Sequence, residues 1–246
     1  MSEEPELSKV PEPEWVARLA KSRPDVVLMA PFMVYLVLLV LNSRVPANYM
    51  PVAIVIRGIG ALAVVWLFRR HLPPMGESHW PLAIVVGVLV AAGWVAGQHL
   101  FNTAVEQAGL SGKWYIFKLR EIDDPRVGLS AFSWRSQVLM RIAVASITVP
   151  IVEEIFWRGF LLRALINWDH FEKIPLGTFT WFSFLGTSLL STLEHPDNWA
   201  VSILCWFAYN GLMYWKKSIG CLIITHGVTN LVLYLYVIAA SDWLFW

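Results

Sequence analysis

The sequence is poor in charged residues. Asp, Glu, Lys and Arg make up only 15% of the 246 residues, whereas hydrophobic residues make up 57%. Soluble domains carry about 25% charged residues, so this balance indicates an integral membrane protein. The formal net charge is only +1, and the sequence shows no cluster of Lys and Arg and no aromatic stacking motif, which argues against nucleic acid as a partner.

Cysteine is also scarce. The sequence has two cysteines, Cys205 and Cys221, and each lies in an apolar run without a CxxC motif or a Cys/His ligand spacing. This pattern argues against a disulfide framework or a zinc knuckle. We expect both cysteines to be small buried side chains.

Apolar windows of near-membrane length fill most of the chain. A spanning helix needs about 20 mostly apolar residues, so the sequence predicts an all-α polytopic transmembrane bundle of about seven spans, with six to eight as the range. The windows are residues 26–42, 52–68, 80–98, 136–165, 176–195, 199–215 and 219–240. The fourth window is too long for one straight crossing and contains Pro150, so we expect a kink or an interfacial first half there.

The windows divide the chain into three parts. Residues 1–25 are acidic and rich in proline, the reverse of a cleavable secretory signal, and we expect a polar tail that leads into an interfacial helix. Residues 26–135 hold the first transmembrane helices and a mixed, charged loop from 101 onward, in which we expect an amphipathic surface helix. Residues 136–240 hold the remaining predicted spans. The distribution of Lys and Arg favours an N-terminus on the inside.

Three charges interrupt the apolar stretch VPIVEEIFWRGFLL at residues 149–162. Each ionisable residue at bilayer depth costs about 2.5 to 3.5 kcal/mol, so such residues are functional candidates. Glu154 and Arg158 are four residues apart with the glutamate first, which is the favoured spacing of a helical ion pair. Glu153 points about 100° away around the helix and lacks such a partner, which suits a general base.

Further polar residues occur in the second half of the chain. His195 precedes Pro196 and is expected at a helix end, level with Glu153 if an antiparallel hairpin turns near residue 174. His226 and Asn230 are four residues apart on one helix face and could offer two hydrogen-bond donors to an oxyanion. Taken singly, these features also fit a structural ion pair in a transporter or scaffold, an interfacial histidine and an interhelical hydrogen bond.

Together, EExxxR, a lone histidine and HxxxN resemble the CAAX protease and bacteriocin-processing family of intramembrane proteases (CPBP, also called Abi), which includes the type II CAAX prenyl endopeptidases. The resemblance covers roughly residues 136–240 and implies that they form the catalytic core. It implies that Glu153 and His195 activate a water and that His226 and Asn230 stabilise the oxyanion. Glu154 and Arg158 complete the first motif as supporting residues.

One position departs from the family pattern. The family usually has Phe four residues before the histidine of the second motif, whereas here that position is Ser191, and Glu194 directly precedes His195. We expect this change to affect how substrate packs beside His195 more than the chemistry.

The resemblance implies an intramembrane endopeptidase, a hydrolase that cleaves a membrane-associated protein, either lipid-modified or carrying a C-terminal sorting signal. Its expected location is the bacterial inner membrane, with lipids and a peptide or protein substrate as partners. Because HExxH is absent, we favour a mechanism without a metal or other cofactor; zinc held by Glu153, His195 and His226 is the alternative. A non-catalytic immunity or scaffold protein is a competing hypothesis, and a transporter ranks last.

Overall fold

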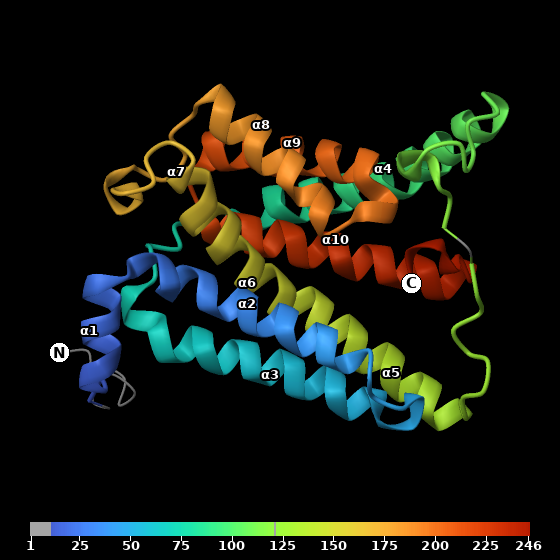
Figure 1. Ribbon diagram of the computed structural model, residues 1–246, viewed down its shortest axis with the longest axis horizontal. Coiled ribbons are helices and arrows are strands. Elements are labelled where there is room, and N and C mark those ends of the chain that lie inside the picture. The colour runs from blue at the N-terminus through green and yellow to red at the C-terminus, as the bar shows by residue number, and fades with distance from the viewer. Residues whose placement is uncertain (1–10, 121) are drawn as a thin grey trace.

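Helices account for all regular secondary structure in the part of the chain that the computed structural model describes, residues 11–120 and 122–246, which contains no strand (Figure 1). The all-α fold class is therefore confirmed. The α-helices are α1 (Glu14–Ser22), α2 (Pro24–Asn42), α3 (Met50–Phe68), α4 (Trp80–Gln107), α5 (Ala131–Ala143), α6 (Val149–Glu154), α7 (Leu162–Ala164), α8 (Trp181–Leu190), α9 (Trp199–Lys216) and α10 (Ile219–Ala240).

Several of these helices are long and apolar enough to cross a membrane. Within the described ranges, four segments meet this criterion, Pro24–Asn42, Ala47–His71, Trp80–Gln107 and Ile219–Ala240, and Trp181–Leu193 is a shorter apolar helix. The chain is therefore an integral membrane protein. The windows predicted at 26–42, 52–68 and 219–240 correspond to α2, α3 and α10, and the total of about seven spans stays a prediction.

The N-terminal tail that we predicted lies partly outside the described residues, because these begin at residue 11. From there, α1 forms a short helix before α2, with Val16 buried and polar residues such as Arg18 on its exposed side. This agrees with the expected helix at the end of the tail.

The prediction of an amphipathic surface helix within residues 101–135 is wrong. Helix α4 continues as far as Gln107, and the only helical segment in the described residues 108–130 is the short 3-10 helix η4 (Tyr115–Phe117). The backbone of this loop turns at three glycines with positive φ, Gly109, Gly112 and Gly128. A left-handed backbone angle ends a right-handed helix, so apolar and charged residues here do not form one continuous face.

Helix α8 also begins later than the predicted window at 176–195. Gly177 has a φ of +73°, and the side chain of Thr180 accepts a hydrogen bond from the backbone N–H of Ser183 at the helix start. This N-cap fixes the first turn of α8 at Trp181.

Residues 131–164 form one long helical segment. Two π-helical segments, η5 (Val144–Thr148) and η6 (Ile155–Leu161), join α5, α6 and α7. Figure 1 shows α5 and α6 running on in one direction, and the kink or interfacial first half that we expected near Pro150 stays a prediction. Pro150 directly follows the wider turns of η5, where the loss of its backbone N–H is tolerated.

Helix α10 packs closely against both α4 and the long helix, and two glycines make this possible. A Cβ atom at Gly87 of α4 would lie 2.7 Å from the carbonyl oxygen of Thr225, and one at Gly227 would lie 2.6 Å from that of Ser146. Thr229 adds a hydrogen bond from its hydroxyl to the carbonyl oxygen of Gly87, at 3.1 Å. These contacts fix the face of α10 that carries His226.

We expect the substitution Gly87→Ala to lower the free energy of unfolding by about 1–3 kcal/mol, because the added methyl group overlaps the backbone of α10. The matched control is Gly93→Ala in the same helix, where an added Cβ meets no atom within 4 Å. That control should be neutral or slightly stabilising, because alanine favours helix. Thermal unfolding of both variants in detergent checks the prediction, and equal stabilities would contradict it.

Candidate active site

A cavity of about 840 Å³ opens between α2, α4, the long helix, α9 and α10. One wall of this cavity is a single stripe of the long helix, because Arg141, Ala145, Val149 and Glu153 all line it at intervals of four residues. At about 1.5 Å per residue, Arg141 and Glu153 are about 18 Å apart along the helix. The cavity is thus elongated, with an arginine near one end and an acidic cluster further along.

Glu154 is the centre of a buried polar network. Its Oε1 accepts a hydrogen bond from Nη1 of Arg158 at 3.1 Å and another from Nδ1 of His226 at 2.9 Å. The side chains of Glu154 and Arg158 are both fully buried. The ion pair predicted from the spacing of these two residues is therefore present, and the same carboxylate also ties the long helix to α10.

The cation of Arg158 is further stabilised by two aromatic rings. Its guanidinium carbon lies 5.1 Å from the ring centre of Trp206 and 5.5 Å from that of Tyr209, both on α9. The Nε and Nη2 atoms have no hydrogen-bond partner among the described residues. Cation–π attraction is worth more where water is excluded, so these rings replace part of the lost hydration.

Glu153 faces the cavity. Its Oε2 is buried and has no hydrogen-bond partner in the described part of the chain, and it lies 4.0 Å from Nε2 of His226. Because Nδ1 of His226 donates to Glu154, the other ring nitrogen is directed toward Glu153. The sequence correctly separated Glu153 from the Glu154–Arg158 pair but did not predict this proximity to His226.

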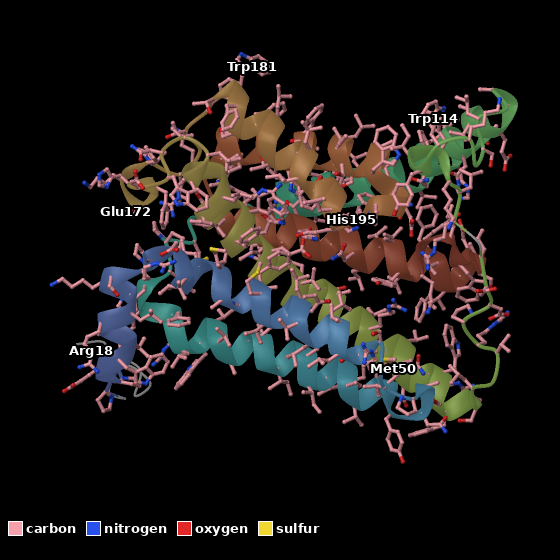
Figure 2. All side chains as sticks on the ribbon, in the orientation of Figure 1. Arg18, Met50, Trp114, Glu172, Trp181 and His195 are labelled. Carbon is pink, nitrogen blue, oxygen red and sulfur yellow. The ribbon has the colours of Figure 1, made fainter. Side chains whose placement is uncertain are left out.

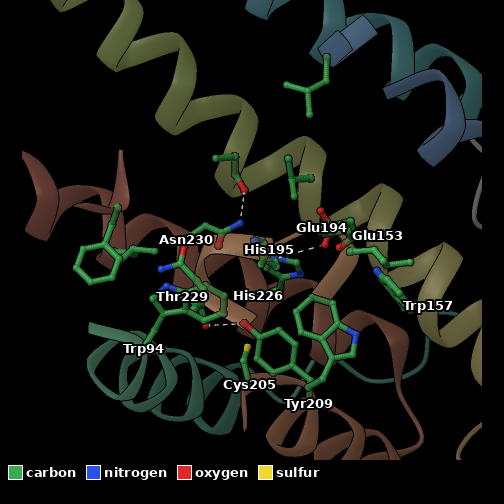
Figure 3. A pocket seen from close by; sticks show the side chains of 18 of the residues that line it. Trp94, Glu153, Trp157, Glu194, His195, Cys205, Tyr209, His226, Thr229 and Asn230 are labelled. Atoms are coloured by element: carbon green, nitrogen blue, oxygen red, sulfur yellow. Dashed lines mark hydrogen bonds and ion pairs between the residues drawn. The ribbon is translucent and has the colours of Figure 1, made fainter. Parts of the chain in front are cut away.

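His195 and Asn230 line the same cavity (Figure 3). His195 follows the 3-10 helix η8 (Ser191–Leu193), and its ring packs edge-on against Trp94 at 5.2 Å between centres. Figure 2 shows it near the middle of the molecule. The structure gives no hydrogen bond between His195 and Glu153, but it places both residues on one cavity, as the predicted hairpin requires.

One of the two amide hydrogens of Asn230 is already used in a hydrogen bond. Its Nδ2 donates a hydrogen bond to the carbonyl oxygen of Ala145 at 2.8 Å. An amide nitrogen carries two hydrogens, so one donor of Asn230 remains for a group in the cavity. His226 and Asn230, four residues apart, therefore present one ring nitrogen and one amide hydrogen to the cavity.

Two features of the site were not predicted. The first is Glu194, which lines the cavity and has a buried Oε2 without a hydrogen-bond partner among the described residues. The second is Tyr209, whose hydroxyl donates to Oγ1 of Thr229 at 2.8 Å and whose ring lies 5.4 Å from that of His226. Glu194 could have been recognised as a candidate site residue, because it is a charged residue directly before His195. Nothing in the local sequence distinguished Tyr209 from other aromatic residues.

Ser191, which stands where the family usually has Phe, belongs to a small hydroxyl network. Its Oγ donates to the carbonyl oxygen of Ser188 at 2.7 Å and lies 2.9 Å from Oγ of Ser202 on α9. The side chain is fully buried. Serine therefore holds η8 close to α9 at this position.

The zinc alternative names Glu153, His195 and His226 as ligands, and this choice of mechanism stays a prediction. In the described ranges, no group of three or more His, Cys, Asp and Glu side chains is positioned to hold a metal ion. Glu153, His195 and His226 share the cavity, but Nδ1 of His226 is occupied by Glu154.

An all-helical bundle whose interior cavity holds several ionisable side chains defines a class, the polytopic membrane proteins with a buried site. Comparison with protein families narrows this class, because residues 135–232 match the family model described as type II CAAX prenyl endopeptidase Rce1-like. The match covers 98 of the 246 residues, and over this segment the chain is similar to that family of endopeptidases. The matched segment contains the six site residues Glu153, Glu154, Arg158, His195, His226 and Asn230.

The two further comparisons gave no match, neither among curated proteins nor among solved structures.

We expect removal of either partner of the buried ion pair to destabilise the protein strongly. Glu154→Leu leaves the Arg158 cation without a carboxylate, and Arg158→Met leaves the carboxylate without its arginine, each at a cost of about 3–5 kcal/mol. The double variant should recover part of the loss, because no unpaired charge then remains. Thermal unfolding in detergent measures this coupling.

The matched control is the pair Glu14 and Arg18, which has the same spacing but an exposed position on α1. Its removal should change the stability by less than about 0.5 kcal/mol. Additive effects of the two substitutions at Glu154 and Arg158 would contradict the interpretation of the buried pair.

Proposed function

We propose that the protein is an intramembrane endopeptidase that hydrolyses a peptide bond with a glutamate-activated water. The observation that carries this proposal is the position of Glu153. Its buried Oε2 has no hydrogen-bond partner among the described residues and faces a cavity large enough for a peptide segment, within the part of the chain that matches the endopeptidase family.

In the proposed reaction, a water molecule binds between Glu153 and His195. Glu153 accepts a proton from this water as the water oxygen attacks the carbonyl carbon of the scissile peptide bond. His195 orients the water through a ring nitrogen. The apolar packing of its ring against Trp94 supports this role, because it holds the imidazole at the edge of the cavity.

The attack places a negative charge on the former carbonyl oxygen, and two groups are available to stabilise it. One is the second amide hydrogen of Asn230. The other is the N–H at Nε2 of His226. This N–H is present in the imidazolium form, in which the N–H at Nδ1 donates a hydrogen bond to Glu154. Donors aimed at a developing oxyanion in a water-poor site contribute strongly to catalysis.

Glu154 and Arg158 support this arrangement without contacting substrate. An imidazolium at His226 is stabilised by the carboxylate at 2.9 Å, and Arg158 holds that carboxylate from the other side. The charges of Glu153, Glu154, Arg158 and protonated His226 sum to zero. A neutral cluster of this kind is far less costly in a low-dielectric interior than any of its members alone.

The shape of the cavity supports a peptide segment as substrate. The stripe from Arg141 to Glu153, about 18 Å long, accommodates about five extended residues. Ala145 and Val149 give this wall an apolar surface, while Arg141 provides a positive charge at its far end for an anionic group of the substrate. We therefore propose as substrate a membrane-associated protein, either lipid-modified or with a C-terminal sorting signal, in the bacterial inner membrane.

We expect Glu153→Gln to abolish cleavage while the protein stays folded, because glutamine has nearly the same shape but cannot accept the proton. General base catalysis is worth about 10²–10⁴-fold in rate. The measurement is mass spectrometry of the membrane proteome and of reconstituted protein, with thermal unfolding as the test of folding. His195→Ala should behave in the same way, and His226→Ala nearly so.

The control for this experiment is Glu106→Gln, which changes an exposed glutamate of α4. It should leave cleavage unchanged. Full cleavage by Glu153→Gln would disprove the assignment of the base, and an intact biological phenotype in all three site variants would favour a non-catalytic protein.

Metal chelation should leave the activity unchanged. The proposed mechanism uses only protein side chains and water, so purified protein treated with EDTA or phenanthroline should cleave at the untreated rate. Elemental analysis should find zinc well below one ion per chain. Stoichiometric zinc whose removal abolishes cleavage would replace this mechanism with the zinc-dependent alternative.

A further inference from the structure

Glu194 is a third carboxylate in the site, and the proposed mechanism does not yet use it. It lies between η8 and the 3-10 helix η9 (Pro196–Asn198), directly before His195. Its side chain lines the same cavity as Glu153, and the two carboxylates are close enough to interact electrostatically. Figure 3 shows Glu194 and Glu153 together at the centre of the site.

Glu194 has no fixed structural task in the described part of the chain. Its Oε2 is buried and has no hydrogen-bond partner among the described residues. The indole N–H of Trp157 lies beside this carboxyl and interacts with it, but the two do not form a hydrogen bond of ordinary geometry. Leaving a buried polar atom unsatisfied costs about 1–3 kcal/mol, so an unpartnered carboxyl that faces a cavity suggests a role with a ligand in that cavity.

The charge balance of the site indicates which form Glu194 takes. Arg158, the cation that acts on Glu194, already pairs with Glu154, and His226 lies between Glu154 and Glu153. An ionised Glu194 would add a negative charge with no partner, next to Glu153. Two carboxyl groups that share a buried site avoid this by keeping one proton between them.

From this juxtaposition we propose that Glu194 is the general acid of the site, a carboxyl that carries a proton and delivers it to the leaving nitrogen of the substrate. This inference rests on the proposed peptide hydrolysis. The groups that face Glu194 from the surrounding elements, and with which it would exchange protons or interact by charge, are Glu153, Glu154, Arg158, His195, Tyr209 and His226.

The proton balance of the reaction closes with these two glutamates. Glu153 takes one proton from the attacking water, and the water oxygen forms the new bond to carbon. Glu194 then gives its proton to the peptide nitrogen as the carbon–nitrogen bond breaks, which releases an amine and a carboxylic acid. The proton on Glu153 passes to Glu194 before the next cycle, so both residues return to their starting forms.

The first test measures the proton on Glu194 without any substrate. Infrared spectroscopy of the full-length protein in lipid detects the carbonyl band of a buried protonated carboxyl at neutral pH. We expect this band in the wild type and in Glu106→Gln, and its loss in Glu194→Gln. A band that persists in Glu194→Gln, or that is missing from the wild type, would overturn the proposal.

The second test uses the chemistry of the leaving group. A peptide that the wild type cleaves is compared with its ester analogue, in which oxygen replaces the scissile nitrogen. An alcohol leaves with less help from an acid than an amine does. Glu194→Gln should therefore slow peptide cleavage by about 100-fold or more and ester cleavage by less than about tenfold, whereas Glu153→Gln should abolish both.

Equal losses on the two substrates, or no loss, would refute the role of Glu194 as an acid while the assignment of Glu153 remained intact. A wild-type protein that cleaves neither a membrane protein nor the ester would instead refute the proposed function. Thermal unfolding of Glu194→Gln excludes misfolding as the cause of a loss, and the isosteric substitution keeps this risk small.

Discussion

The carboxylate of Glu154, shared between Arg158 and His226, is the interaction on which the rest of the site depends. In the apolar interior none of these three groups is stable alone, but the shared carboxylate forms a hydrogen bond of 3.1 Å or less with each of the other two. The carboxylate orients the His226 ring, and the arginine it binds packs against two aromatic rings of α9. As a result, the neighbouring Glu153 is left without a tight partner and faces the cavity.

This network can form only because α10 lies very close to the long helix. Gly227 lets the backbone of α10 approach the carbonyl oxygen of Ser146, and Pro150 lacks the N–H that would bond this carbonyl in a regular α-helix. One turn further along α10, Asn230 donates to the carbonyl of Ala145. In a regular α-helix, the carbonyl oxygens of Ala145 and Ser146 would accept hydrogen bonds from the same helix. In the π-helical turns they face α10 instead, and these turns form part of the cavity wall.

Local rules predicted what depends on near neighbours in the sequence. The pair of Glu154 and Arg158 follows from a spacing of four residues, and α2, α3 and α10 follow from apolar length. The hydrogen bond between Glu154 and His226 joins residues 72 positions apart, so no local rule contains it. The loop before α5 was mispredicted because composition does not reveal left-handed backbone angles, as at Gly112. Glu194 departs visibly from the family pattern, but only the folded chain places it beside Glu153.

The most direct test of the central claim, that Glu153 faces the reacting carbonyl while Glu154 is held by Arg158 and His226, is an experimental structure with a bound, non-cleavable peptide. A peptide analogue with a tetrahedral hydroxyl group in place of the scissile carbonyl would serve. The account predicts that this hydroxyl lies within hydrogen-bond distance of Glu153 and of Asn230, with the analogue extended toward Arg141. A peptide bound outside the cavity, or Glu153 turned to pair with Arg158, would contradict it.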